Sequence, residues 1–272
     1  MKTFGSHKFT AYVLLALFFT LPARAETINC TPITSLPAVI STQGLYCLTG
    51  NLATSEASGL AITINANNVT LDLNGWKVGG QGAGAGTASY GIYSTAVNVT
   101  VKNGIVRGFY FGIFLTGRGA LVQNMLVDQS THAGIFVNGT GAVVEHNQVV
   151  DTGGSTNGTN EAAIGIEADS DGVKLNNNMV SGLTAMGTGN EYGIFASGAN
   201  GLVQNNFVTD TAVPTGGGSS FGIYQYGNSL AVNNTVSNFD YGIYNAGIYA
   251  HNTAYNCTTA YSGGTAGAGN SP

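Results

Sequence analysis

The sequence has few charged residues, prolines and cysteines. Asp, Glu, Lys and Arg make up 8% of its 272 residues, and there are five prolines and three cysteines. So few Lys and Glu residues cannot cover the exposed faces of many helices, while a hydrophobic content of 43% is too high for a disordered chain. The composition therefore argues against both a helical protein and an intrinsically disordered one.

Glycine and aromatic residues are abundant instead. The chain contains 41 Gly, 13 Tyr and 12 Phe residues. Short β-prone runs separated by Gly and Asn are typical of an all-β protein with many tight turns. We therefore expect an all-β fold.

The first 25 residues resemble an export signal. Lys2 and Lys8 precede an apolar run from Phe9 to Leu21, and Ala23-Arg24-Ala25 supplies the small residues that signal peptidase reads. We expect cleavage before Glu26 and a periplasmic or extracellular protein. Because no later segment has 18 or more apolar residues in succession, we expect no transmembrane span.

Removal of this segment leaves an acidic chain. The remaining chain has thirteen acidic residues and five basic ones, which are Lys77, Lys102, Arg107, Arg118 and Lys174. A protein that binds nucleic acid needs a basic face, so nucleic acid is not an expected partner. An anionic glycan would also need a local basic site or a bridging cation.

Export makes disulfides possible, and two of the three cysteines are close in sequence. We predict a disulfide between Cys30 and Cys47, ahead of the repeats. Cys257 would then be a free buried thiol or, alternatively, the site of an intermolecular cross-link.

A repeat can be aligned on seven Gly-Ile pairs, at Gly91, Gly112, Gly134, Gly165, Gly193, Gly222 and Gly242, and an aromatic residue follows six of them. The first copy is Gly91-Ile92-Tyr93, and the copies are 20 to 31 residues apart. Ten to thirteen residues after each glycine comes an Asn, followed two positions later by an apolar residue. These asparagines are Asn103, Asn124, Asn147, Asn178, Asn206, Asn234 and Asn252, with Asn74 as an earlier member.

A repeat near 20 residues with three short β-prone runs is too short for a propeller blade and fits one rung of a parallel β-helix. Rungs stack about 4.8 Å apart, so about eight rungs would form a rod on the order of 40 Å long. Asparagine suits the sharp turns, and its amide can bond to the next Asn along the stack. We therefore expect an Asn ladder.

Alternation along each strand predicts which side chains face inward. The Ile of each copy should be buried, together with the residues two positions earlier. Those residues are Tyr90, Phe111, Ala133, Ile164, Tyr192, Phe221 and Tyr241. The residues after each Ile should form an outward ladder of Tyr93, Phe114, Phe136, Glu167, Phe195, Tyr224 and Tyr244.

The connection from each Asn strand to the next glycine varies in length. The long connections begin near Gly79, Asp151, Ser181 and Asp210. All insertions should therefore leave one edge of the rod, where solenoids that carry function usually place it.

The repeats, with the lead-in "AITINANNVTLDLNGW", resemble the right-handed parallel β-helix proteins of the pectate-lyase-like superfamily, particularly periplasmic carbohydrate-binding and sugar-hydrolysis repeats. The resemblance covers roughly residues 60 to 256. We expect a signal peptide (1–25), an N-terminal cap (26–60), a β-helix (61–262) and a flexible tail (263–272). Because the superfamily includes lyases, hydrolases, epimerases, tailspikes and binding proteins, the fold does not decide the function.

One candidate site combines Arg107, Asp128 and Asp151, which follow successive ladder asparagines by four residues. They should lie side by side about 5 Å apart. Two neighbouring carboxylates could share a proton or bind Ca²⁺, and the resemblance implies that an adjacent Arg suits a lyase acting on a uronate. Alternatively, the two Asp residues only cap turns. His132 could serve as a base near Asp128.

The second candidate is Glu167, which replaces an aromatic residue in the outward ladder. It could be an acid or base whose pKa is raised by aromatic neighbours. Alternatively, it is a solvated carboxylate that interrupts an exposed, aggregation-prone row of aromatic side chains. The outward aromatic residues could stack on sugar rings, be covered by loops, or form a contact between subunits of an oligomer.

Two functions follow. The first is an exported protein that binds a polysaccharide, which we favour because no complete catalytic constellation is evident. The second is a polysaccharide-active enzyme, a lyase on uronates or a glycoside hydrolase, that uses Arg107, Asp128, Asp151 and Glu167 and possesses a Ca²⁺ site at Asp128 and Asp151. A purely structural surface protein is the remaining alternative.

Overall fold

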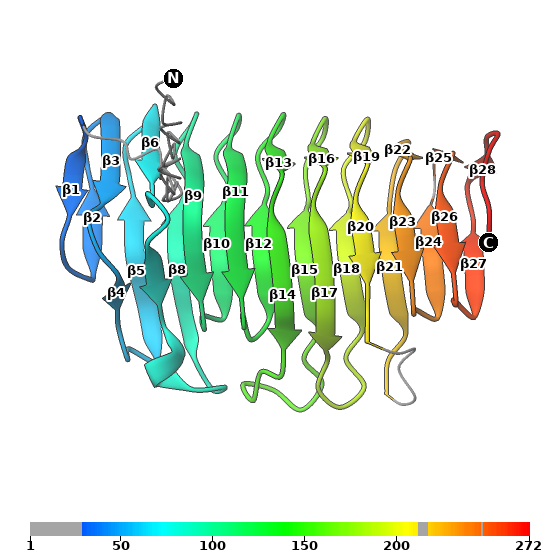
Figure 1. The fold of residues 1–272 in the computed structure, drawn as a ribbon, viewed down its shortest axis with the longest axis horizontal. Coiled ribbons are helices and arrows are strands. Elements are labelled where there is room, and N and C mark those ends of the chain that lie inside the picture. The colour runs from blue at the N-terminus through cyan, green and yellow to red at the C-terminus, as the bar shows by residue number, and fades with distance from the viewer. Residues whose placement is uncertain (1–28, 212–216, 246) are drawn as a thin grey trace, which may run out of the picture.

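The protein is a rod of stacked parallel strands. The computed structural model describes residues 29–211, 217–245 and 247–272, so the expected signal peptide lies outside the described residues. Two long sheets with only parallel pairings run side by side along the rod, and one short 3-10 helix, η1 (Gln81–Ala83), lies at its edge (Figure 1). The predicted parallel β-helix is confirmed.

The ten-stranded sheet contains one strand from each coil. The repeats predict about eight rungs; seven of the ten strands contain the Gly-Ile pair, and β2, β5 and β27 do not. The sheet consists of β2 (Ala38–Ile40), β5 (Ser58–Ile64), β8 (Ala88–Ser94), β10 (Phe111–Leu115), β12 (Ala133–Val137), β15 (Ala163–Ala168), β18 (Glu191–Ala196), β21 (Ser220–Gln225), β24 (Tyr241–Asn245) and β27 (Thr259–Ser262).

The eighteen-stranded sheet contains two strands from most coils, separated by a bend. In β9 and β11 the two are continuous. The sheet consists of β1 (Thr31–Ile33), β3 (Gly44–Leu48), β4 (Leu52–Ala53), β6 (Val69–Asp72), β7 (Lys77–Gly79), β9 (Thr100–Arg107), β11 (Leu121–Asp128), β13 (Val143–Glu145), β14 (Gln148–Gly153), β16 (Lys174–Asn176), β17 (Met179–Thr184), β19 (Leu202–Gln204), β20 (Phe207–Thr209), β22 (Leu230–Val232), β23 (Thr235–Ser237), β25 (Ile248–Ala250), β26 (Thr253–Tyr255) and β28 (Thr265–Ala266).

The apolar interior confirms the predicted inward column of isoleucines. All seven are fully buried, and parallel pairing aligns each with the next; they are Ile92, Ile113, Ile135, Ile166, Ile194, Ile223 and Ile243. A slip of one residue would turn this column to solvent, so burial of the column fixes the register of the ten-stranded sheet.

Strict alternation breaks at the glycine before each Ile, which corrects one prediction. The rings of Phe111 and Phe114 lie 5.1 Å apart, so the residue two before each Ile shares the outer surface with the residue after it. Gly112 faces inward instead, because a Cβ there would lie 2.5 Å from Val127 Cγ1 and 2.6 Å from the Gly134 carbonyl oxygen. The predicted aromatic stack inside the rod is therefore wrong, and these residues form a second outward column.

The recurring asparagines form a buried ladder in most of the rod. The Asn178 amide donates to Asn206 Oδ1 at 3.0 Å and to the Val144 carbonyl at 2.8 Å. The backbone N–H of Asn178 also donates to Asn206 Oδ1, at 2.9 Å. The same pattern links Asn147, Asn178, Asn206, Asn234, Asn252 and Asn270.

The first predicted members of this ladder belong to a different column. Asn103 and Asn124 have φ values of 59° and 53°, in the left-handed region, and their side chains bond to each other at 3.3 Å. That turn column continues through His146 and Asn177. Because asparagine suits both positions, the alignment placed Asn103 and Asn124 in the ladder although they lie one position before it.

Both ends of the rod are built from strands. Cys30 and Cys47 form the predicted disulfide beside β1 and β3, and Cys257 is a free, half-buried thiol. Residues 263–272 were expected to be a flexible tail, but β28 pairs with β25 and Ser271 pairs with Thr253. No helix in the described part of the chain is long and apolar enough to cross a membrane.

One interior polar side chain is poorly placed. Gln225 is fully buried beside Ala196 and Asn245, and neither of its amide atoms has a hydrogen-bond partner among the described residues. An unsatisfied buried amide costs about 1–3 kcal/mol. We expect Gln225→Met to raise the free energy of unfolding in urea by about 1 kcal/mol. A lower stability would show that the amide has a polar partner, such as a buried water.

Candidate functional site

The outer surface of the ten-stranded sheet carries two columns that we call the aromatic face. The long connections leave the rod at one edge of this sheet (Figure 1). The column before the glycines is Tyr90, Phe111, Ala133, Ile164, Tyr192, Phe221 and Tyr241, and the column after the isoleucines is Tyr93, Phe114, Phe136, Glu167, Phe195, Tyr224 and Tyr244. All predicted glycan-contacting residues therefore lie on one surface, and their side chains are partly exposed.

The rings of the second column form two separate stacks. Phe114 lies 5.5 Å from Tyr93 and 4.4 Å from Phe136, with nearly parallel planes. Beyond Glu167, Tyr224 lies 5.3 Å from Phe195 and 4.9 Å from Tyr244, again nearly parallel. Rings inside a stack cover the faces of their neighbours. A ring face is therefore available to a ligand only where a stack ends.

Both columns are interrupted in the same place. Glu167 is paired with Phe136 on one side and Phe195 on the other, and the first column has Ala133 and Ile164 in these rungs. We call Ala133, Ile164 and Glu167 the interruption. Phe136 ends one stack and Phe195 begins the other, so these two rings flank Glu167 in the second column.

Glu167 is the unusual carboxyl of this surface. Burial, repulsion from Asp169 and a hydrogen bond with Asp169 together raise the pKa of Glu167 to about 8. Asp169 also accepts a hydrogen bond from Ser197 Oγ at 2.9 Å. Glu167 therefore keeps its proton at neutral pH and can donate a hydrogen bond or a proton, as a general acid does.

This raised pKa predicts a pH-dependent stability. The pKa of Glu167 is about 8 in the folded protein and 4.5 ordinarily. The contribution of the protonated side chain to the free energy of unfolding is therefore complete below pH 4.5 and is lost as the pH rises through 8. Glu167→Gln keeps a neutral side chain at every pH. We expect the free energy of unfolding of the variant, measured in urea, to rise by about 4 kcal/mol relative to that of the wild type between pH 5 and pH 9. If the difference in unfolding free energy between the variant and the wild type were the same at pH 5 and pH 9, the raised pKa would be contradicted.

A second group of polar residues borders the interruption at the loop-bearing edge. His132 stacks on Tyr110 at 4.6 Å, and Tyr110 Oη donates to Glu161 at 3.3 Å. His132 Nδ1 lies 3.1 Å from the Ala162 carbonyl oxygen and 3.6 Å from Glu161. Burial lowers the pKa of His132, more than these two neighbours raise it. His132 thus contacts Glu161 rather than serving Asp128, and Glu161 went unnoticed because its long connection has no repeat pattern.

Arg107 and Asp128 are neighbours, as predicted, but on the eighteen-stranded sheet. Their Nε and Oδ2 atoms are 2.8 Å apart, and Arg107 also donates to Gln129 at 3.3 Å. Burial raises the pKa of Asp128, opposed by Arg107 and reinforced by Asp151. The guanidinium is held in an ion pair, so it is poorly placed to act as a base.

Asp151 does not continue this row. Asp128 pairs with Val150, and Asp151 occupies the next position, a left-handed turn with φ 52°. The structure thus places Arg107 and Asp128 together, Asp151 one position away, and Glu167 on the other sheet. In the part of the chain that the structure describes, no group of three or more Asp, Glu, His or Cys side chains could hold a metal ion.

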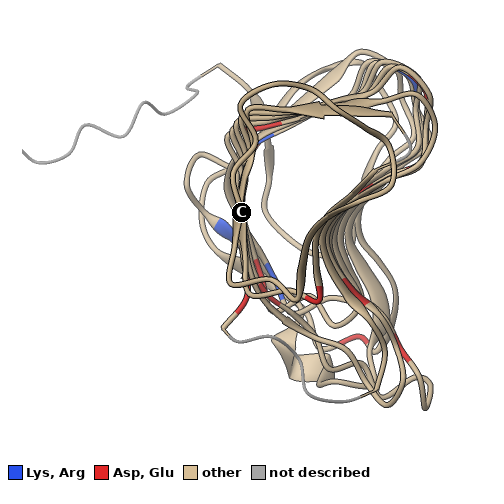
Figure 2. Ribbon diagram, turned by 90° about the vertical axis from the view of Figure 1, so that its right-hand side faces the viewer, with Lys and Arg blue, Asp and Glu red and all other residues tan. Residues whose placement is uncertain are grey.

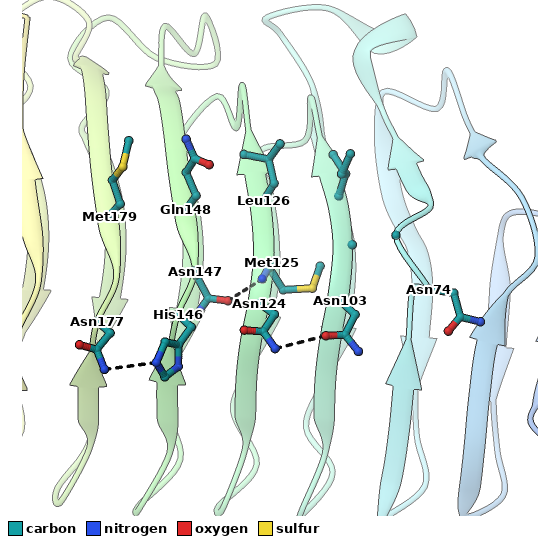
Figure 3. Close-up of a pocket in the computed structure, with 13 residues that line it drawn as sticks. Asn74, Asn103, Asn124, Met125, Leu126, His146, Asn147, Gln148, Asn177 and Met179 are labelled. Atoms are coloured by element: carbon teal, nitrogen blue, oxygen red, sulfur yellow. Dashed lines mark hydrogen bonds between the residues drawn. The ribbon is translucent and has the colours of Figure 1, made fainter. Parts of the chain in front are cut away.

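A separate groove follows the bend of the eighteen-stranded sheet. Its volume is about 780 Å³, and Asn103, Asn124, His146 and Asn177 line it together with Met179 (Figure 3). No carboxylate, Lys or Arg side chain lines this groove, and His146 is the one titratable side chain among its lining residues. The chemistry of the surface is concentrated on the aromatic face.

The two long parallel sheets and the columns of this surface define a parallel β-helix protein. The Dettilon tailspike protein gp208 is similar in structure, with a TM-score of 0.58 and 16% sequence identity over 82% of this chain, which spans 46% of the tailspike chain. The A-module of the Azotobacter vinelandii mannuronan C-5 epimerase AlgE6 aligns with a TM-score of 0.42 and 12% identity, over 90% of this chain and 91% of the module. No family model and no curated protein sequence matches the chain.

Proposed function

We propose that this protein is exported and binds a polysaccharide on the aromatic face, with the interruption at the centre of the site. One observation carries the proposal: two aromatic stacks end on either side of a carboxyl whose pKa is raised to about 8. Ring faces pack against the apolar faces of sugars, and a few placed polar groups orient the ligand. The Cys30–Cys47 disulfide supports export to an oxidising compartment.

The partial exposure of the aromatic residues favours ligand contact over cover by loops. Loops that folded over the columns would bury them, and the six aromatic residues of the second column remain in contact with solvent. Titration calorimetry with a panel of soluble polysaccharides tests the proposal. We expect saturable binding of at least one polymer. Absence of binding across the panel would reject the proposal.

Catalysis at the same place is the second candidate function, because a protonated Glu167 could act as a general acid on a glycosidic oxygen. A lyase that uses Arg107 is less favoured, since Arg107 is paired with Asp128. Polymers incubated with and without Ca²⁺ separate the possibilities. New reducing ends lost in Glu167→Gln would indicate a hydrolase, and unsaturated ends lost in Arg107→Ala would indicate a lyase. Binding without either product supports the binding protein.

A further inference from the structure

Basic residues are missing from the sheet that carries the aromatic face. Its ten strands contain no Lys, Arg or His, and they contain the two acidic residues Glu167 and Glu191. In the view along the rod, the wall opposite the C-terminus carries acidic segments but no basic ones along its length (Figure 2).

The basic residues lie elsewhere in the described part of the chain. Lys77, Lys102, Arg107 and Lys174 belong to strands of the eighteen-stranded sheet, and Arg118 lies in a turn that follows β10. Two of these are already in ion pairs, Lys102 with Asp72 at 3.3 Å and Arg107 with Asp128 at 2.8 Å. These two side chains are not available to neutralise a ligand on the other sheet.

Carboxyl groups surround the interruption instead. Asp169 is hydrogen-bonded to Glu167, and Glu161 borders the interruption through its contacts with Tyr110 and His132. Farther along the same edge, Asp240 accepts hydrogen bonds from Ser220, whose strand carries Phe221 of the aromatic face. The only basic group that faces these carboxyls in the described residues is His132, whose pKa is lowered by burial.

An anionic polymer on this face would bring like charges together. Like charges a few ångströms apart repel more strongly near a protein surface than in bulk water, because the effective dielectric constant is lower there. A uronan or sulfated glycan carries one charge on many of its sugars, and this penalty would recur along the polymer. An uncharged glycan keeps the stacking and hydrogen bonds without the penalty.

We infer that the polysaccharide bound by the aromatic face is uncharged, rather than a uronan or a sulfated glycan. The inference rests on the proposed function and adds its substrate class. It also opposes the uronan-active reading of the sequence, because a uronate needs a neutralising cation that this face does not supply.

Matched pairs of polymers test the inference with the full chain. Each pair shares a backbone and differs in charge, such as polygalacturonate and its full methyl ester, or mannan and polymannuronate, titrated in EDTA. We expect the neutral member of at least one pair to bind at least about tenfold more tightly than its anionic counterpart. The Kd of the neutral member should change less than about twofold between 50 mM and 500 mM NaCl, because salt screens interactions between charges and the neutral polymer carries none. Equal or tighter binding of the anionic members would overturn the inference while leaving glycan binding intact. No binding of any polymer would reject the proposed function itself.

Two charge-removing variants sharpen the result. Glu161→Gln is expected to reduce the ratio of the Kd of the anionic polymer to the Kd of the neutral polymer, because it removes a negative charge beside the interruption. Glu145→Gln makes the same change on the eighteen-stranded sheet and is expected to leave the ratio unchanged. An equal effect of both variants would show that total charge, and not the aromatic face, sets the preference, and would overturn the inference.

Discussion

Asn206→Leu is expected to lower the free energy of unfolding by about 4 kcal/mol. Asn206 Oδ1 accepts hydrogen bonds from the backbone and side chain of Asn178 at 2.9 and 3.0 Å. Its amide donates to the Leu175 carbonyl at 2.9 Å and to Asn234 Oδ1 at 3.0 Å. Leucine is similar in size but leaves several of these buried groups unpaired, and each costs about 1–3 kcal/mol.

The neighbouring residue provides the control. Asn205 is exposed and has a φ of 57°, which glycine adopts readily. We expect Asn205→Gly to change stability by less than about 1 kcal/mol. Urea unfolding followed by circular dichroism measures both variants. Similar small losses in the two would contradict the buried Asn ladder as a main source of stability.

The double variant Phe136→Ala/Phe195→Ala is expected to lose about 100-fold in affinity for the polysaccharide, since burial of an aromatic side chain contributes about 1.5–3 kcal/mol. These rings end the two stacks on either side of Glu167. Each single variant should lose about tenfold on the same basis.

Phe207→Ala is the matched control for this loss. Phe207 is 42% exposed and belongs to β20 of the eighteen-stranded sheet. We expect its affinity to stay within about twofold of the wild type, because the proposed ligand does not touch it. Melting temperatures verify that the variants fold. Wild-type affinity in the folded double variant would place the ligand elsewhere.

The sequence predicted the fold well because the solenoid repeats its constraints. The seven Gly-Ile pairs of the repeat report the same buried position, so the inward Ile column and the outward column through Tyr93 and Phe114 could be aligned by counting residues. The adjacency of Arg107 and Asp128 followed from the same counting. The Cys30–Cys47 disulfide followed from sequence proximity and expected export.

Errors arose where the backbone departs from the regular pattern. Glycine can face the crowded interior next to Ile, so strict alternation assigned Phe111 and Tyr192 to the wrong side. A left-handed turn beside the Asn ladder shifted Asp151 away from Asp128 by one position.

Parts of the candidate site depend on contacts that repeats do not encode. Glu161 reaches Tyr110 and His132 from a long connection without a repeat pattern. The proton held by Glu167 depends on burial and on Asp169, which only the folded arrangement supplies. The replacement of an aromatic residue by Glu in one rung was nevertheless a usable signal.

Fluorine NMR of the protein labelled with 4-fluorophenylalanine tests the central claim most directly. Resonances of Phe136, Phe195 and Phe207 can be assigned from Phe→Tyr variants and followed during titration with an oligosaccharide that binds. The account predicts that the Phe136 and Phe195 signals shift in proportion to occupancy while the Phe207 signal stays in place. A saturable shift of Phe207 with no change at Phe136 and Phe195 would contradict it.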